Sequence, residues 1–284
     1  MARRLLDELG DETVARIADS ASADLTSLWL EVARRRAARR TPADVVRAYT
    51  RDAYVAPAPA DPLVLRALEL TCLRCAADRG FEPVELSPLA PLGACSTFSA
   101  GGQNRVLAAS RSLEVVADPT NVLALECAQR RRAGIREPIA LAAAARAVRC
   151  QPLRSEGHTR HFSLFAVATA ARDNDSRHFA VRALAEHVAL HRSILDAHAP
   201  GRLEGMRIAA TDDYRASAAA LADVCRDDVG EVHLEPLDHD YYHGLRFQLL
   251  FRLDRATVPI PDGGLFDWMR TLRSDRKEQL VASA

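Results

Sequence analysis

The sequence predicts an α+β fold in which a largely antiparallel sheet is flanked by helices and preceded by a small helical region. Two observations lead to this prediction. The first 55 or so residues have helical periodicity, whereas most strand-like segments follow residue 62. These strands do not alternate regularly with helices, as they would in a doubly wound fold. The sequence contains no GxGxxG and no GxxxxGK[ST] motif, so neither a dinucleotide-binding fold nor a P-loop is supported.

Composition narrows the class of protein. The chain has 284 residues, enough for one large or two modest domains. Hydrophobic residues make up 48% and charged residues 27%, as in soluble globular proteins. The 38 basic and 38 acidic residues balance, which argues against a surface devoted to nucleic acid and leaves only a local basic groove open.

The sequence also predicts where the protein works. No stretch reaches the roughly 18 apolar residues of a membrane span. The start, MARRLLDELGDE, lacks the apolar segment of a signal peptide. We therefore expect a cytoplasmic protein with reduced cysteines and no membrane partner. Cys72 and Cys75 have CxxC spacing, but they lie in a helical pattern without a second CxxC, so a buried helix face is favoured over a zinc or redox site.

The N-terminal region, residues 1–55, is expected to be helical. Apolar periodicity indicates helices near residues 11–18 and 25–32, and Thr41-Pro42-Ala43-Asp44 is typical of a cap that opens a third over 45–49. The basic run 34–40 is interpreted as a solvated helix face rather than a nucleic-acid contact. A linker rich in Pro and Ala, residues 56–62, marks a boundary before a second domain, 62–284.

The body of the chain contains helices separated by groups of strands. Helices are expected at 63–79, ended by Gly80, at 122–132 after the capping sequence Asp118-Pro119-Thr120-Asn121, at 179–197 and at 212–225. Small residues at 93–102 indicate a loop. Strands are expected at 81–86, 106–108, 113–116, 147–150, 162–167, 206–211, 232–237, 245–253 and 279–282.

Residues 147–167 form the first candidate site. Two apolar segments flank a polar, basic loop that turns at Gly157. Arginine offers a bidentate fork to planar anions, so such a loop could hold a phosphate or carboxylate. A solvated hairpin with a charged tip is the alternative that the local pattern favours. The basic side chains of the segment are Arg149, Arg154, His158, Arg160 and His161.

Two further segments could contact a ligand. Asp118 and Thr120 stand where a helix begins; they could simply cap it, or they could face the ammonium group of a ligand. The segment 238–244 is dense in polar groups, and strand alternation would place Asp240 and Tyr242 on one face and Tyr241 on the other. Aromatic hydroxyls beside carboxylates suit the recognition of a small polar molecule.

The sequence offers one candidate metal site and no recognisable nucleophilic site. His187 and His191 are spaced i, i+4, with His198 near the same face, and Asp238, His239 and His243 could complete a metal site. A polar helix surface is favoured over metal binding, so no metal ligand is assigned. No Ser-His-Asp or Cys-His arrangement and no GxSxG motif is found.

Taken together, these segments resemble the catalytic core of class II aminoacyl-tRNA synthetases, in the histidyl-tRNA synthetase branch, from about Pro62 onward. GFEPVELSPLAPL resembles the dimer-forming first motif, with Pro88 as its proline. VRCQPLRSEGHTRHFSLFAV resembles the second motif, with its arginine on a strand. DPTNVLALECAQRRR resembles the segment that holds the amino group of the amino acid, and DHDYYHGLRFQ the histidine-specific tyrosine segment. Residues 263–267 resemble the glycine-rich strand that follows.

The resemblance implies a set of site residues. Arg149 would be the catalytic arginine that clamps the α-phosphate and carboxylate. Asp118 and Thr120 match the positions that hold the amino group, and Tyr241 and Tyr242 match the paired tyrosines. The substrate-binding residues implied in this way are Asp118, Thr120, Gln151, Arg160, His161, Asp240, Tyr241, Tyr242 and Gly264.

The departures from the family pattern affect the expected activity. Gln151 stands where the second motif usually has Glu, and Leu237 stands where histidyl enzymes carry an additional catalytic Arg. The glycine-rich end of the third motif, its ATP-binding Arg and an anticodon-binding domain are not found. Loss of cations around the triphosphate should lower the rate of adenylation by several orders of magnitude. We therefore do not expect this chain to charge tRNA.

Two functions from different classes stay open. The first is a non-charging paralogue that binds an amino-acid-like ligand and a partner enzyme subunit, as the regulatory subunit of ATP phosphoribosyltransferase does. The second is an enzyme that reuses the pocket to activate or modify a free amino acid, in which case ATP and Mg²⁺ would be required. The resemblance also implies a homodimer through residues 63–92.

Overall fold

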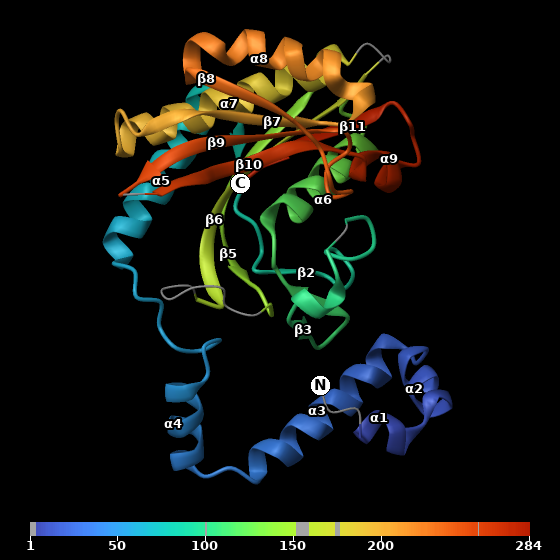
Figure 1. Cartoon of the computed structure of the whole chain (residues 1–284). Coiled ribbons are helices and arrows are strands. Elements are labelled where there is room, and N and C mark those ends of the chain that lie inside the picture. Colours follow the sequence, from blue (N-terminus) through green and yellow to red (C-terminus); the bar gives the residue numbers. More distant parts are fainter. Residues whose placement is uncertain (1–3, 100, 152–158, 174–176, 255) are drawn as a thin grey trace.

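The computed structural model describes residues 4–99, 101–151, 159–173, 177–254 and 256–284. Four N-terminal helices lie at one end of the molecule, and the remaining elements form a body built on an eight-stranded sheet (Figure 1). The α+β class is therefore confirmed.

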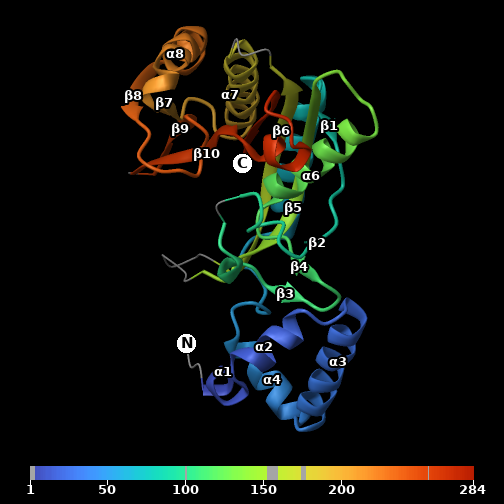
Figure 2. The ribbon, with the colours of Figure 1, turned by 90° about the vertical axis from the view of Figure 1, so that its right-hand side faces the viewer.

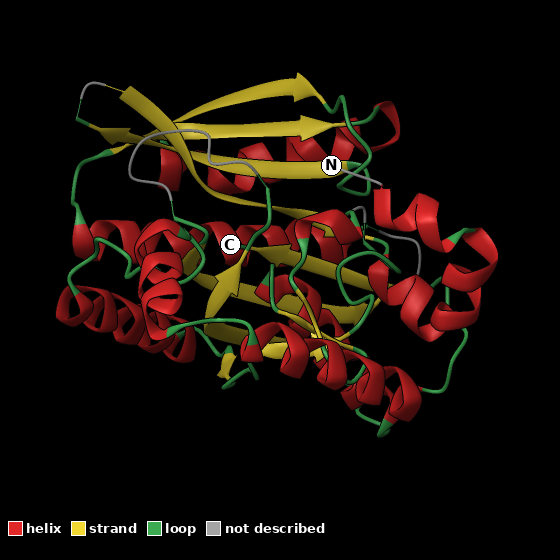
Figure 3. Ribbon diagram, turned by 90° about the horizontal axis from the view of Figure 1, so that it is seen from below, coloured by secondary structure: helices red, strands yellow, loops and turns green. Residues whose placement is uncertain are grey.

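The N-terminal helices lie apart from the sheet and are joined to it by the linker after α4 (Figure 1), so that in the view from below they lie in front of the body (Figure 3). The helix α4 begins at a capping box, in which Thr41 and Asp44 each accept a hydrogen bond from the backbone N–H of the other. No described residue in these four helices is buried, and the basic run 34–40 is exposed as expected. The helices are α1 (Arg4–Leu9), α2 (Asp11–Ala18), α3 (Ser22–Ala38) and α4 (Pro42–Arg51).

The main sheet has the order β1-β5-β6-β11-β10-β9-β7-β8. Only the β1–β5 and β7–β8 pairs are parallel, so the sheet is predominantly antiparallel. Its strands are β1 (Glu82–Pro83), β5 (Ile139–Val148), β6 (His161–Arg172), β7 (Leu203–Ala210), β8 (Glu231–Pro236), β9 (Leu245–Leu253), β10 (Ala256–Phe266) and β11 (Glu278–Ser283).

Two strands differ from the sequence prediction in a way that matters for the site. The hairpin of β5 and β6 is longer than predicted, and its register runs from Ile139 opposite Ala170 to Val148 opposite His161. Arg149 therefore lies one residue beyond β5, where its N–H donates to the carbonyl of Arg160 over 2.9 Å. The strand expected at 81–86 shrinks to two residues: the N–H of Phe81 donates to the carbonyl of Ala76 in the preceding helix, and the last bond to β5 is from the N–H of Val84 to the carbonyl of Ala142.

A second, three-stranded sheet shapes one rim of the body. It has the order β2 (Leu89–Pro91), β4 (Leu113–Val115), β3 (Ala108–Ala109), with a 3-10 turn η1 (Gln103–Arg105) before β3. Glu114 of β4 is buried and accepts hydrogen bonds from the backbone N–H groups of Gly93 and Cys95. The loop that was expected at 93–102 is thereby fixed against this small sheet.

Helices cover both faces of the main sheet. On one face, α7 (His178–His198) and α8 (Arg215–Val229) pack on β7, β9, β10 and β11, and α5 (Pro62–Asp78) packs on β5 (Figure 2). A 3-10 turn, η2 (Asp212–Tyr214), precedes α8. On the other face lie α6 (Pro119–Arg132) and α9 (Trp268–Arg273). In β11, Val281 joins the α7/α8 cluster, whereas Leu280 and Ala282 join the α6/α9 cluster, as strand alternation requires.

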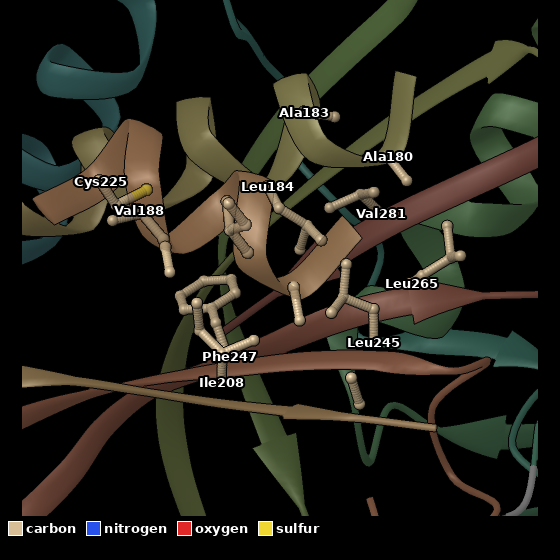
Figure 4. Packing of buried hydrophobic residues seen from close by; sticks show 14 of the residues in the cluster. Ala180, Ala183, Leu184, Val188, Ile208, Cys225, Leu245, Phe247, Leu265 and Val281 are labelled. Carbon is tan, nitrogen blue, oxygen red and sulfur yellow. The ribbon is translucent and has the colours of Figure 1, made fainter. Parts of the chain in front are cut away.

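The larger core cluster lies between α7, α8 and the sheet (Figure 4). Leu184 of α7 and Phe247 of β9 are fully buried there, as is Ile208 of β7. Burying each such side chain stabilises the fold by roughly 1.5–3 kcal/mol.

None of the helices in the described ranges combines the length and apolar character that a membrane crossing needs. The six cysteines are free, and Cys72 is buried on α5 as expected.

Candidate functional site

A cavity of about 1080 Å³ opens on the α6 side of the sheet. This is at the upper end of the roughly 300–1,000 Å³ typical of small-molecule sites. Its walls come from the loop after β2, the start of α6, the ends of β5 and β6, the segment before β9, and parts of β10 and β11. Six of the residues predicted for the site line it: Asp118, Thr120, Arg149, Gln151, Tyr241 and Tyr242.

Arg149 is held in place at one end of the cavity. We call Arg149 and its partner Asp118 the Arg149 pole. Its Nε–H donates to the carbonyl of Ala117 over 2.8 Å, and its Nη2 lies 3.4 Å from Oδ2 of Asp118. Its guanidinium carbon lies 5.2 Å from the ring centre of Phe162. The side chain keeps 31% of its exposure, so its remaining N–H groups can reach a ligand in the cavity.

Asp118 both caps a helix and contacts Arg149. It is the N-cap of α6, and its Oδ1 accepts hydrogen bonds from the backbone N–H of Thr120 (3.0 Å) and from the Thr120 hydroxyl (2.7 Å). The capping interpretation is therefore correct. Because Oδ2 faces Arg149, the same carboxylate also orients the arginine.

The two tyrosines form an aromatic wall beside this pole. Tyr241 and Tyr242 meet edge to face with ring centres 5.0 Å apart, and Tyr241 also contacts Phe266 and Trp268. Burial raises the pKa of Tyr241, and the nearby Asp118 carboxylate adds to the increase. Burial, followed by the Asp262 carboxylate, raises the pKa of Tyr242. Both phenols are therefore neutral hydrogen-bond donors at physiological pH.

Gly264 supports this wall from behind instead of lining the cavity. A Cβ at this position would lie 2.4 Å from Cδ1 of Tyr242 and 2.5 Å from the carbonyl oxygen of Leu245. The absence of a side chain is thus what lets the Tyr242 ring pack against β10.

Besides Gly264, three predicted residues lie outside the cavity wall. Asp240 is exposed, because residues 238–243 form a turn and not the strand on which the alternation argument depended. Arg160 lies over the ring of Tyr54 at 5.1 Å and donates to the carbonyl of Gln151. His161 accepts from Arg146 through Nδ1 (2.7 Å), so its Nε2–H donates to the carbonyl of Ala56 (2.7 Å).

Arg160 and His161 therefore connect the β5–β6 hairpin to the linker from the N-terminal helices. Arg154 and His158, also named in the basic loop, lie outside the described residues.

A second charged group in the cavity was not found from the sequence. Arg246 of β9 and Asp262 of β10 form a two-pronged ion pair, with Nε to Oδ1 at 2.9 Å and Nη2 to Oδ2 at 2.5 Å. The Tyr242 hydroxyl donates to the same carboxylate over 2.8 Å, and Arg246 Nη1 lies 3.2 Å from Nε2 of His239. We call Arg246, Asp262 and His239 the Arg246 pole.

The geometry can now be compared with known proteins. No protein-family model and no curated protein sequence matches the chain. Among solved structures, histidyl-tRNA synthetase from Staphylococcus aureus superposes with a TM-score of 0.60 at 15% identity over 82% of this chain and 66% of that enzyme. An ATP phosphoribosyltransferase regulatory subunit/histidyl-tRNA synthetase from Bacillus halodurans C gives 0.59 at 14% identity over 80% of each chain.

The RNA-binding domain of threonyl-tRNA synthetase from Cryptosporidium parvum Iowa II gives 0.61 at 11% identity over 78% of this chain and 60% of that one. This chain has the class II aminoacyl-tRNA synthetase fold. At these identities the likeness establishes the fold alone, and proteins of different amino-acid specificity share it.

Within this class II fold, the residues that depart from the family pattern have clear positions. Gln151 lines the cavity just after Arg149, so an amide occupies a wall position where a carboxylate was expected. Leu237 is partly buried against the α6/α9 core cluster, so its side chain supplies no cation to the cavity. Cys95 also lines the cavity, and burial raises the pKa of its thiol, which keeps it protonated.

Two histidines of α7, His187 and His191, are buried, which corrects the expectation of a polar helix surface. His187 is fully buried and His191 is 5% exposed. His187 lies 2.9 Å from the Thr169 hydroxyl and 2.9 Å from that of Ser283, and His191 lies 2.8 Å from Ser283. Hydroxyls from β6 and β11 thus bond both ring nitrogens of His187 and Nε2 of His191, which helps to offset the cost of burying the two imidazoles.

The described residues contain no cluster of three or more His, Cys, Asp or Glu side chains that could hold a metal ion. For a phosphate group, the cations that line the described part of the cavity are Arg105, Arg149 and Arg246. Of these, Arg149 pairs with Asp118 and Arg246 with Asp262, but both keep uncommitted N–H groups that could meet an anionic ligand, and Arg105 pairs with no carboxylate among the described residues.

Proposed function

We propose that this chain is a paralogue of histidyl-tRNA synthetase that does not charge tRNA and that binds an amino-acid-like ligand in its cavity. Its role would be regulatory or accessory, in the amino-acid or specialised metabolism of the cytoplasm. The observation that carries the proposal is the Arg149 pole. A guanidinium fixed by Asp118 and Ala117 next to a neutral phenol can bind a carboxylate, while the Asp118 carboxylate lies close enough to attract an α-ammonium group.

The proposal that tRNA charging has been lost rests on Gln151 and Leu237. An amide at position 151 offers no negative charge to a metal ion or an adenine amino group, and a leucine at position 237 offers no charge to a developing phosphate anion. Both changes remove electrostatic stabilisation from the adenylation transition state, while the Arg149 pole can still bind the ground state of an amino acid.

A partner enzyme subunit fits the same proposal. The structurally similar Bacillus halodurans protein is described as an ATP phosphoribosyltransferase regulatory subunit/histidyl-tRNA synthetase. The N-terminal helices of the present chain expose apolar side chains, such as Trp29 at 50% and Val46 at 63%, which a partner subunit could cover. Co-purification of the full-length chain with a phosphoribosyltransferase catalytic subunit would support this role.

Calorimetric titration tests the proposal. The full-length protein is titrated with histidine and the other common amino acids, with and without ATP. At least one should bind, and Arg149→Ala and Tyr242→Ala should each weaken binding by at least about tenfold, the effect of losing a charged or buried hydrogen bond. Arg172→Ala, at the far end of β6 with its side chain 53% exposed, is the matched control. No binding across the panel would overturn the proposal.

The alternative is an enzyme that activates or modifies a free amino acid with ATP and Mg²⁺. One observation favours it: the cavity of about 1080 Å³ is larger than a free amino acid requires, and Arg105 provides a second free cation on its wall. Pyrophosphate exchange separates the two functions. Exchange that depends on an amino acid and disappears in Arg149→Ala would establish adenylation, whereas binding without exchange supports the regulatory paralogue.

A further inference from the structure

The Arg246 pole has a hydrogen-bonding pattern that restricts what can bind beside it. An ionised carboxylate offers about four lone-pair directions. In Asp262, Oδ1 accepts from the Tyr242 hydroxyl and from Arg246 Nε, while Oδ2 accepts from Arg246 Nη2 and from Gln248 Nε2 at 3.2 Å. All four directions are occupied, so Asp262 has no free lone pair for a donor on a ligand.

Arg246 has the opposite character. Of its five N–H hydrogens, two go to Asp262 and one goes from Nη1 to His239, so one hydrogen on each terminal nitrogen is uncommitted. The side chain is 21% exposed and lines the cavity. Arg246 therefore presents free donors to a ligand.

His239 adds a donor to the same wall. Because arginine can only donate, Nε2 of His239 must accept the hydrogen bond from Arg246, which leaves the proton of the neutral ring on Nδ1. This Nδ1–H is buried and has no acceptor among the described residues. A buried donor without a partner costs about 1–3 kcal/mol, so an added acceptor at this pole would be stabilising.

The Arg246 pole and the Arg149 pole belong to one cavity and are joined by the two tyrosines. The Tyr241 phenol is close enough to both poles to be influenced by Asp118, Arg149 and Asp262. Tyr242 packs against Tyr241 and donates to Asp262. A ligand whose α-amino and carboxylate groups occupy the Arg149 pole would therefore extend its side chain along this aromatic wall toward Arg246.

We infer that the Arg246 pole selects a side chain that ends in an oxygen acceptor, a carboxylate or a carboxamide, so that the ligand is an amino acid of the glutamate or glutamine type and not histidine. This inference rests on the proposed function, because the Arg149 pole must first hold the amino-acid backbone. A lysine or arginine side chain would place its own N–H donors against the N–H donors of Arg246 and His239. A neutral imidazole has one acceptor nitrogen with a single lone pair for the Arg246 and His239 donors, whereas a carboxylate or carboxamide oxygen offers at least two lone pairs.

The test is a calorimetric panel on the full-length protein with glutamate, glutamine, histidine, lysine and leucine. Glutamate or glutamine should bind at least about tenfold more tightly than the other three, which corresponds to about 1.4 kcal/mol. The comparison of these two distinguishes a carboxylate from a carboxamide. Arg246→Met and His239→Phe should each reduce this preference while leaving the affinity for leucine nearly unchanged.

Controls separate a local effect from misfolding. Arg252→Met alters another arginine of β9, whose side chain is 55% exposed, and should leave the preference intact. Circular dichroism and urea unfolding of each variant verify the fold. Tightest binding of histidine, lysine or leucine would overturn this inference and leave the proposed function standing. If none of the amino acids binds, both this inference and the proposed function are overturned.

Discussion

Arg130 and Arg131 are consecutive residues of α6, and each pairs with a glutamate in very different surroundings. Arg131 pairs with Glu278 of β11 at 3.2 Å, with 3% and 6% of the two side chains exposed, and its Nη1 also donates to three backbone carbonyls. Glu278→Gln would leave a buried guanidinium without a counter-charge. We expect a loss of about 3–5 kcal/mol in the free energy of unfolding, measured by urea denaturation.

The neighbouring pair provides the control. Arg130 pairs with Glu82, whose side chain is 58% exposed. Because exposed ion pairs contribute at most about 1 kcal/mol, Glu82→Gln should lower the unfolding free energy by less than that. Equal losses in the two variants would show that burial does not determine the energies of these pairs.

The two buried histidines of α7 predict how stability changes with pH. Burial lowers the pKa of His191 to about 3 and holds the pKa of His187 well below its ordinary value. In the unfolded chain both rings titrate near pH 6.5. As the pH falls below about 6.5, the unfolded state binds protons that the folded state does not bind. The contribution of these histidines to the unfolding free energy is therefore fully present above this pH and decreases toward pH 3.

Urea denaturation at pH 7.5, 6 and 5 checks this expectation. Each histidine should account for a loss of about 2 kcal/mol at pH 5 relative to neutral pH. His191→Gln should remove one histidine's share of the pH dependence, even if it also lowers stability at neutral pH. His198→Gln, at the exposed end of the same helix, is the matched substitution. A pH dependence that is unchanged in His191→Gln would contradict the argument.

At the scale of elements, the pairing of β9 with β10 determines the shape of the aromatic wall. Gly264 lies opposite Arg246 in this pair, and a Cβ there would overlap the Tyr242 ring and the Leu245 carbonyl. Gly264→Ala must displace the ring, so we expect a loss of about 1–3 kcal/mol in stability and weaker ligand binding. Gly102→Ala, where a Cβ meets open space, should change the unfolding free energy by less than about 0.5 kcal/mol. Unfolding curves and calorimetry measure the two effects.

The elements also show what sequence alone could predict. Helices with clear periodicity are predicted within a few residues, as α5 and α7 illustrate, because this signal is local. The cap at Asp118 was found for the same reason. The Arg246–Asp262 pair was missed, although LRFQLL alternates polar and apolar residues, because contact between the two residues depends on the register of β9 with β10.

The errors have a common physical cause. The α7 histidines were assigned to a polar surface because their partners, Thr169 and Ser283, lie on strands far away in the sequence. The position of Asp240 outside the cavity follows from a turn where alternation assumed a strand. In both cases the side chain was placed from an assumed periodic face, and that periodicity shows neither the distant hydroxyl partners nor the turn.

At the scale of the whole molecule, α5 offers a surface for the proposed homodimer. Leu63 and Leu70 lie seven residues apart on the same face of this helix and are 80% and 48% exposed. Light scattering should give the mass of a dimer for the full-length protein, and the double variant Leu63→Glu with Leu70→Glu should be monomeric. Leu234→Glu, on the exposed edge strand β8, is the control. A monomeric unmodified protein would contradict the proposal.

The last prediction concerns the division of the chain at residues 56–62. No described residue of α1–α4 is buried, and the contacts that join this region to the body include His161 with the Ala56 carbonyl, Arg160 over Tyr54, and Ser22 with Ser112. These contacts exclude little apolar surface from water. In a chain that begins at residue 61, the unfolding free energy of the body, measured by urea denaturation, should therefore change by no more than about 0.5–1 kcal/mol.

The same shortened chain should bind amino acids with unchanged affinity, because every described residue of the cavity wall comes from position 95 or later. Removing α1–α4 also removes exposed apolar side chains such as Trp29 and Val46, so the shortened chain should lose any binding to a partner subunit that these helices mediate. A body that aggregates or loses more than about 2 kcal/mol of stability would show that the helices belong to its core. An intact body that still retains the partner would place the docking surface elsewhere.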